Sequence, residues 1–260
     1  MIMGLPTPGT NNLQVLRAIE DGWQAFCRAP WPFLLFQVLA LLIAAPFAAL
    51  AAAGVMRLSG PDLAFLHPIA ASLALVVGVV GYVVVALWGV VGLVRGAWLC
   101  LEGQRPVFRT FTRWDGAASG RLLLSSALLL IVVAVAAVVC SLLGTGLGTI
   151  NAALGAVPLL VFAVFYVWLL ITQKFLIQLS LLGIARPLQT LQAGVAGVNP
   201  SWWVVLWLAV VETVMHGIAL LFSYGGLFVI LPLMICISTA AYRQLFGSQD
   251  HTGLMREPQP

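Results

Sequence analysis

The sequence predicts an all-α, polytopic membrane protein, a helical bundle of about six transmembrane helices with both termini in the cytoplasm. First, 62% of its 260 residues are apolar and only 8% are charged, whereas soluble domains have roughly 45–50% apolar and 25% charged residues. Second, the apolar residues gather in six runs, and a transmembrane helix needs about 20 such residues. Third, nearly all basic residues fall on one side of the resulting topology. This composition excludes a soluble enzyme, a disordered chain and a nucleic-acid-binding domain.

Six spans are expected, separated by short connections. The fourth is short, but apolar sequence continues beyond Lys174. We expect Pro46 and Pro232 to kink their helices, and a tight turn at residues 223–226 to join the last two spans. The spans lie at roughly 32–56, 69–94, 122–143, 158–173, 202–222 and 225–242.

The first apolar run could instead belong to a signal peptide cleaved near the alanines at residues 51–53. However, the run begins only after residue 31 and is about 25 residues long, whereas the apolar region of a signal peptide has about 7–15 residues close to the start of the chain. We therefore expect an uncleaved first span.

The basic residues predict the orientation. Eleven of the twelve lie before the first span, after the second, after the fourth or in the C-terminal tail, and Arg57 alone lies on the opposite side. Because Lys and Arg concentrate in cytoplasmic loops, this split predicts cytoplasmic termini and an even number of spans. Six tryptophans fall at the same boundary, as in an aromatic belt: Trp23, Trp31, Trp98, Trp114, Trp202 and Trp203.

Each pair of spans follows a segment with the pattern of an interfacial amphipathic helix on the cytoplasmic side. In the first segment, residues 13–27, apolar and polar side chains separate onto opposite faces at the helical period. Its apolar face consists of Val15, Leu16, Ile19, Trp23 and Phe26, and its polar face of Arg17, Glu20, Asp21 and Gln24.

The second amphipathic segment is the most basic part of the chain. Pro106 suits the first turn of a helix, and Arg105, Arg109 and Arg113 follow one another at intervals of four residues, which predicts a single basic stripe. Arginine beside anionic headgroups gains roughly 1 kcal/mol per charge. We therefore expect Arg105, Arg109, Arg113 and Trp114 to contact anionic lipid or a partner. The opposing apolar face consists of Val107, Phe108, Phe111 and Trp114.

The third segment, residues 186–199, also opens with Arg-Pro and matches the first at an offset of 172 residues. This likeness suggests one helix–hairpin unit used three times. Alternatively, any interfacial helix has this period and any span can begin with Trp, so that no duplication is needed. The repeats would be residues 13–94, 95–173 and 186–242.

Three parts are expected in the chain. Residues 1–31 form a cytoplasmic N-terminus with the first amphipathic helix. Residues 32–245 form a single six-span membrane domain. Residues 246–260 form a disordered cytoplasmic tail.

Motifs at both ends of the chain resemble one family. The opening has Gly22-Trp23-x-x-Phe26 and Pro30-Trp31-Pro32, and the final third has Arg186-Pro187-Leu188, Asn199-Pro200, Trp202-Trp203, Gly225-Gly226 and Tyr242-Arg243-Gln244-Leu245. Together these resemble bacterial integral membrane proteins related to the glycerophosphoryl diester phosphodiesterase membrane domain, which are largely of unknown function. The resemblance covers most of the chain and implies this architecture in a bacterial inner membrane or an internal membrane. It carries over no catalytic residue, because in such phosphodiesterases a separate soluble domain performs the chemistry.

Glu212 is the one acidic residue near the middle of an expected span, and His216 lies four residues later on the same helix face. An intramembrane ionisable residue is costly and marks a candidate functional site. The two could relay a proton, bind a cation or hold a substrate group. Alternatively, Glu212 is protonated, or hydrogen-bonded to His216 or to Tyr or Ser of another span, and only holds helices together. We expect Lys174 to reach the cytoplasmic interface.

No catalytic motif, metal site or cofactor site is expected. The four cysteines form no C-x-x-C pair and lie beside no histidine cluster. The order Glu-x-x-x-His also differs from the His-Glu-x-x-His of zinc proteases.

We therefore expect a non-catalytic membrane protein that acts as a scaffold, assembly or lipid-interacting factor through its basic cytoplasmic face. Its partners would be membrane lipids or other membrane proteins, and not nucleic acid. The alternative is a small transporter or channel that uses Glu212 and His216. An intramembrane enzyme acting on lipid has no support at the required residue spacings.

Overall fold

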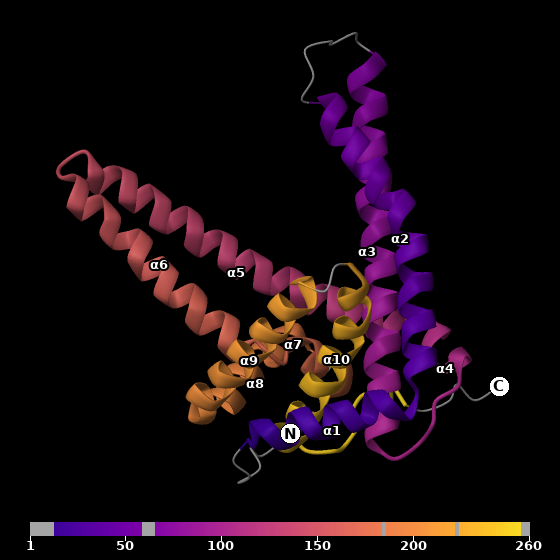
Figure 1. Cartoon of the computed structure of the whole chain (residues 1–260). Helices are drawn as coiled ribbons and strands as arrows, with labels where there is room; N and C mark the ends of the chain where they lie inside the picture. Colours follow the sequence, from indigo (N-terminus) through magenta and orange to yellow (C-terminus); the bar gives the residue numbers. More distant parts are fainter. Residues whose placement is uncertain (1–12, 59–65, 184–185, 222–223, 256–260) are drawn as a thin grey trace. The chain divides into compact units, whose positions relative to one another are not determined.

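The chain is built from α-helices in the computed structural model, which describes residues 13–58, 66–183, 186–221 and 224–255 (Figure 1). This part contains no β-strand, and six of its helical segments are long and apolar enough to cross a membrane. The long helices are α2 (Pro30–Leu58), α3 (Leu66–Leu101), α5 (Gly116–Gly148), α6 (Ala152–Thr172), α9 (Trp202–Leu221) and α10 (Tyr224–Phe246). The short elements are α1 (Val15–Arg28), α4 (Phe108–Thr112), α7 (Leu176–Gln178), the π-helical turn η1 (Leu179–Gly183), α8 (Pro187–Val198) and the 3-10 turn η2 (Asn199–Ser201).

The six long helices coincide with the six expected spans, but several extend further. Helix α3 continues to Leu101, so Arg95 lies inside a helix and not in the predicted loop. Helix α5 includes the glycine-rich residues 144–148, so the predicted connection 144–157 shrinks to three residues. Of the turn predicted at 223–226, residue 223 lies outside the described residues, and the glycines belong to the first turn of α10. Continuous apolar sequence explains these extensions, because glycine interrupts a helix less in a membrane than in water.

Contacts within the chain divide it into two compact units. The first, which we call the α2–α3 unit, consists of residues 22–115 and 219–236. The second, which we call the α5–α6 unit, consists of residues up to 21, residues 116–218 and residues from 237 onward.

In the α2–α3 unit, two long helices form a close-packed hairpin (Figure 1). A Cβ added at Gly54 of α2 would lie 2.7 Å from the backbone nitrogen of Leu75 and 2.8 Å from the carbonyl oxygen of Ala71. A Cβ added at Gly78 of α3 would overlap the backbone nitrogen of Ala51. Small residues allow this approach, as they do between transmembrane helices in general.

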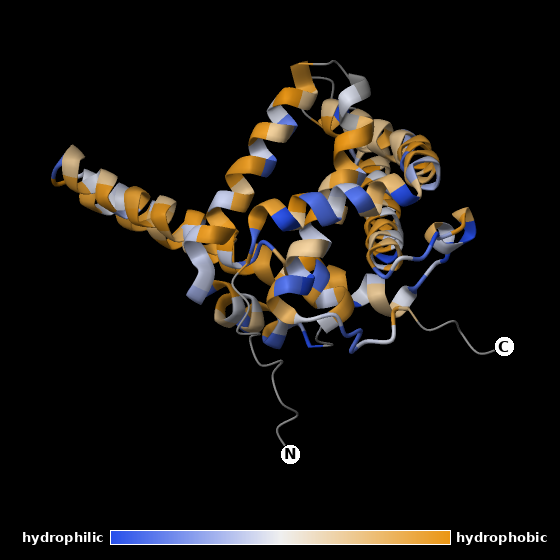
Figure 2. Cartoon of the chain, turned by 60° about the horizontal axis from the view of Figure 1, so that its bottom comes forward, coloured by the Kyte–Doolittle hydropathy of each residue, from blue (hydrophilic) through white to orange (hydrophobic). Residues whose placement is uncertain are grey.

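In the α5–α6 unit, the hairpin of α5 and α6 also depends on glycine. A Cβ at Gly155 of α6 would lie 2.8 Å from the Cα of Gly148 and 2.9 Å from the carbonyl oxygen of Gly144. Asn151 caps α6, because its side chain accepts a hydrogen bond of 2.8 Å from the backbone nitrogen of Ala153. Apolar residues predominate along the long helices, which are mostly orange in Figure 2.

The apolar surface of the long hairpin helices is mostly exposed. Only 11% of the most apolar stretch of α3, and the same share in α5, is buried inside the protein, compared with 67% in the last span. A soluble protein rarely exposes apolar patches of this extent. The arrangement indicates a membrane-embedded protein whose hairpins face hydrocarbon.

The core of the α5–α6 unit lies around the turn η1. Leu179, Leu181 and Leu182 are fully buried, as is Ile237 of α10. Three aromatic side chains pack together beside this core. Tyr242 stacks on Phe246 with ring centroids 5.1 Å apart, and Phe175 lies edge-on to Phe246 with ring centroids 6.1 Å apart.

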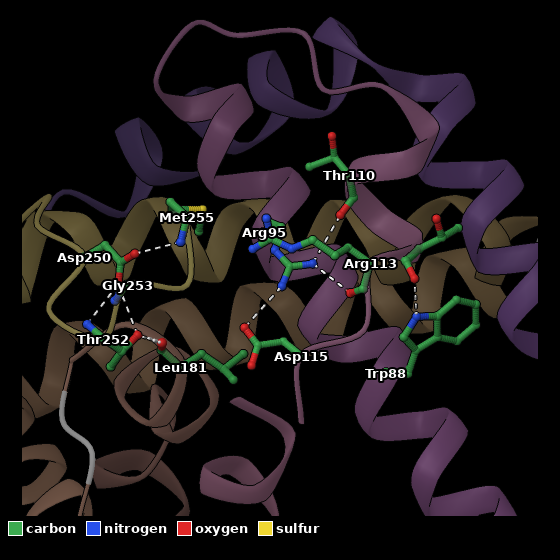
Figure 3. Close-up of polar contacts among 11 residues, drawn as sticks. Trp88, Arg95, Thr110, Arg113, Asp115, Leu181, Asp250, Thr252, Gly253 and Met255 are labelled. Atoms are coloured by element: carbon green, nitrogen blue, oxygen red, sulfur yellow. Dashed lines mark hydrogen bonds and ion pairs between the residues drawn. The ribbon is translucent and has the colours of Figure 1, made fainter. Parts of the chain in front are cut away.

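The described part of the C-terminal tail is folded, which differs from the prediction of a disordered tail from residue 246. Residues 247–255, which we call the strap, turn back from α10 and pack against η1 (Figure 3). Asp250 accepts hydrogen bonds from the backbone nitrogens of Gly253 at 2.9 Å and Met255 at 2.8 Å.

A short helix precedes each pair of long helices, namely α1, α4 and α8. Helices α1 and α8 cover the predicted segments. Helix α4 is shorter than expected and contains only Phe108–Thr112. Arg105 and Arg113 therefore lie outside it, and the three arginines do not form one helical stripe. Arg113 instead adopts an extended conformation that ends the helix. The threefold repeat stays a prediction.

Candidate functional site

The basic segment, which we define as residues 104–115, is fixed to the α2–α3 unit by a buried aromatic side chain. Phe111 is fully buried and lies edge-on to Phe33 of α2, with ring centroids 4.9 Å apart. Gly96 of α3 makes room for it, because a Cβ at this position would overlap the Phe111 ring. The segment is therefore anchored at its centre.

Arg95 holds the backbone of the basic segment from inside α3. The residue is 1% exposed, and its Nη1 donates hydrogen bonds to the carbonyl oxygens of Thr110 at 3.2 Å and Arg113 at 2.9 Å (Figure 3). Its Nη2 lies 3.7 Å from the carboxylate of Asp115. Hydrogen bonds from a charged donor are roughly twice as strong as neutral ones. Arg95 is therefore an internal support of the segment and not one of its membrane contacts.

The anchored segment leaves both basic and apolar side chains exposed. Trp88 of α3 donates a hydrogen bond of 2.9 Å to the carbonyl oxygen of Thr112, which fixes the end of α4. Arg113 is half-buried. The exposed side chains are Arg105, Arg109, Val107, Phe108 and Trp114, of which Val107 is 66% and Trp114 52% exposed. Apolar and basic groups exposed together suit the boundary between hydrocarbon and anionic headgroups.

Glu212 forms a buried ion pair in the α5–α6 unit. Its side chain is 5% exposed, and its Oε2 accepts a hydrogen bond from Nζ of Lys174, whose side chain is 23% exposed. Its Oε1 accepts a hydrogen bond of 3.1 Å from Oγ of Ser238 in α10. The pair thus joins α9, α10 and the segment that follows α6, and compensates a charge that would otherwise be costly to bury.

His216 does not provide the hydrogen bond that the sequence suggested for the Glu212 carboxylate. Its Nδ1 lies 2.9 Å from the backbone carbonyl oxygen of Glu212, within the same helix. Glu212 and His216 lie one helical turn apart on α9. The described contacts of the Glu212 carboxylate, however, are to Lys174 and Ser238. In the described part of the chain, no group of three or more His, Cys, Asp or Glu side chains could hold a metal ion.

Lys174 lies where the helical path of α6 is interrupted. Helix α6 ends at Thr172, and α7 begins only at Leu176. Beside this break, Gln173 is 6% exposed and donates a hydrogen bond of 3.0 Å to the carbonyl oxygen of Leu191. Gln178 is 2% exposed, and its Oε1 has no hydrogen-bond donor among the described residues. The break therefore gathers polar side chains inside an otherwise apolar unit.

The sequence suggested a serine of another span as one candidate partner of Glu212, and Ser238 of α10 is such a serine. Which serine it is could not be predicted, since that depends on how α9 and α10 pack. Lys174 was missed as a partner. Its signal was the apolar sequence that continues beyond it, which is unusual for a lysine at a membrane interface. Arg95 carried the same signal, because apolar residues continue beyond it to Cys100.

Comparison of the chain with protein-family models, with curated proteins and with solved structures finds no match.

Proposed function

We propose that the chain is a non-catalytic integral membrane protein that acts as a scaffold, assembly or lipid-interacting factor through a basic cytoplasmic face. The observation that carries the proposal is the basic segment, which is anchored by Arg95 and Phe111 while Arg105, Arg109 and Trp114 stay exposed. Anchoring lowers the entropic cost of binding, because the contact groups are already positioned.

In this proposal the six long helices span the membrane, and both termini and the basic segment lie in the cytoplasm. The count of basic residues supports this orientation. The inner leaflet of a bacterial membrane, or an internal membrane, supplies the anionic surface. Exposed Trp23 and Trp31, which belong to the same unit as Trp114, would lie at its headgroup level. The buried state of Glu212 also supports a structural use of this acid.

The proposal predicts that neutralising the exposed arginines weakens the binding of anionic lipid. Each basic residue near an anionic surface contributes about 1 kcal/mol. Replacing Arg105 and Arg109 together by Gln should therefore reduce the affinity for phosphatidylglycerol about thirty-fold. The measurement is a titration of the purified, detergent-solubilised protein with a short-chain fluorescent phosphatidylglycerol.

The matched control is Arg57→Gln, since Arg57 is also exposed but belongs to the opposite side in the proposed topology. It should leave the affinity unchanged. Equal binding of phosphatidylglycerol by wild type and double variant, or equal binding of phosphatidylcholine and phosphatidylglycerol by the wild type, would contradict the proposal.

A second candidate is a small transporter or channel. The observation in its favour is the break between α6 and α7, because transporters place substrate sites at interrupted helices near the middle of the membrane. Glu212, His216 and Lys174 would then line the pathway. This candidate requires a pH-dependent flux into liposomes that Glu212→Gln abolishes, whereas the proposal above expects no flux above that of empty vesicles.

A further inference from the structure

The strap supplies hydrogen-bond donors to the end of a helix. The last carbonyl groups of any helix lack partners within it, and η1 ends at Gly183. The backbone nitrogen of His251 donates a hydrogen bond of 2.9 Å to the carbonyl oxygen of Leu182, and Oγ1 of Thr252 donates one to that of Leu181. The strap thus satisfies two backbone acceptors next to buried leucine side chains.

The conformation of the strap depends on one carboxylate. Asp250 Oδ1 accepts hydrogen bonds from the backbone nitrogens of Thr252 at 3.0 Å and Gly253 at 2.9 Å, while Oδ2 accepts one from the backbone nitrogen of Met255 at 2.8 Å (Figure 3). Gly253 has a φ of 76°, which favours glycine. Asp250 therefore fixes the turn that presents Thr252 to η1.

The strap has one buried apolar side chain, and it contacts a segment that leads back to the buried ion pair. Leu254 is 1% exposed, whereas the side chain of His251 is exposed. A segment with one buried apolar anchor is among the first to open in a folded protein. The chain that it covers leads back through α7 to Lys174, the partner of Glu212.

We propose that the strap is a detachable segment that stabilises η1 while it is docked, and that the Asp250 carboxylate holds the strap in its docked conformation. When the strap is docked, it completes the hydrogen bonding of η1 and holds residues 174–183 in one conformation. When the strap leaves, two carbonyl groups lose their donors and this segment opens more often. The device is independent of the lipid contact proposed for the basic segment, since the two belong to different units of the chain.

The test is backbone hydrogen exchange of the full-length protein in nanodiscs, followed by mass spectrometry. Asp250→Ala should make exchange in residues 176–183 about ten-fold faster or more, because several backbone hydrogen bonds are lost together. Thr252→Val, which removes only the hydroxyl group, should show a smaller increase in the same residues. His251→Ala keeps the backbone donor and should exchange as the wild type does.

Two results would overturn the inference. One is an unchanged exchange rate in residues 176–183 of Asp250→Ala. The other is an equal acceleration in α2 and α3, which would mean that the variant destabilises the whole protein. A deletion of residues 248–260 provides the second variant, and it should reproduce the local effect of Asp250→Ala without changing the helical content.

Discussion

Replacing Lys174 by Met lowers the free energy of unfolding by about 3 kcal/mol, because it leaves the Glu212 carboxylate buried without its cation. Glu212 cannot move to water, since its side chain is only 5% exposed and is also held by Ser238. The partial exposure of Lys174 places the expected cost at the lower end of the range for buried ion pairs. This is one of the two largest effects that we expect from a single substitution.

A double-mutant cycle separates the ion pair from general loss of packing. Glu212→Gln removes the charge and keeps an acceptor for Ser238, so the combination of Lys174→Met with Glu212→Gln should recover more than half of the lost stability. Equilibrium unfolding in mixed detergent and SDS micelles, monitored by circular dichroism, measures these differences. If Lys174→Met were as stable as the wild type, or the double variant no better than the single one, the ion pair would have no structural importance.

Arg95→Met should release the basic segment with a local cost of about 3 kcal/mol or more. The substitution leaves the carbonyl oxygens of Thr110 and Arg113 without this donor, and hydrogen bonds from a charged group contribute about 1.5–3 kcal/mol each. It also removes the cation beside Asp115. Met fills a similar apolar volume along α3, so the hairpin of α2 and α3 should stay folded.

Hydrogen exchange in residues 104–115 measures this release. We expect an increase of about a hundred-fold in Arg95→Met, which corresponds to about 3 kcal/mol, and no change in α2. Arg105→Met is the matched control, because Arg105 is exposed and makes no hydrogen bond or ion pair with the residues that the structure describes. An equal increase in both variants, or none in Arg95→Met, would show that the basic segment is held by other contacts.

The membrane architecture could be predicted from the sequence, because a run of about 20 apolar residues has few other stable forms. The predicted ends of the membrane-spanning helices were less accurate, and the reason is physical. Hydropathy marks the part of a helix that faces hydrocarbon, whereas α3 continues into a protein-packed region where the polar residue Arg95 is also buried. Arg95 illustrates this difference, since its charge was taken to mark a loop although its side chain is enclosed by backbone carbonyl groups.

The candidate sites were predictable in part. Glu212 was evident because a carboxylate in an apolar run is rare, but the identity of its partner depended on a break in the helical path after Thr172. The exposed groups of the basic segment were recognised by residue type. The arrangement of these side chains could not be predicted. Phe111 and Arg95 fix the segment in a partly extended conformation, which helical periodicity does not describe. The strap was missed because residue type alone does not show which backbone groups the Asp250 and Thr252 side chains contact.

The proposed cytoplasmic position of the basic segment can be measured through the accessibility of single cysteines. In a variant without the native cysteines, Cys would replace Arg109, Arg57 or Ile150, all of which are exposed. A membrane-impermeant maleimide is then added to intact cells or to opened membranes. We expect position 109 to react only after the membranes are opened, and positions 57 and 150 to react in intact cells. Labelling of position 109 in intact cells, or of positions 57 and 109 from the same side, would contradict the proposed position.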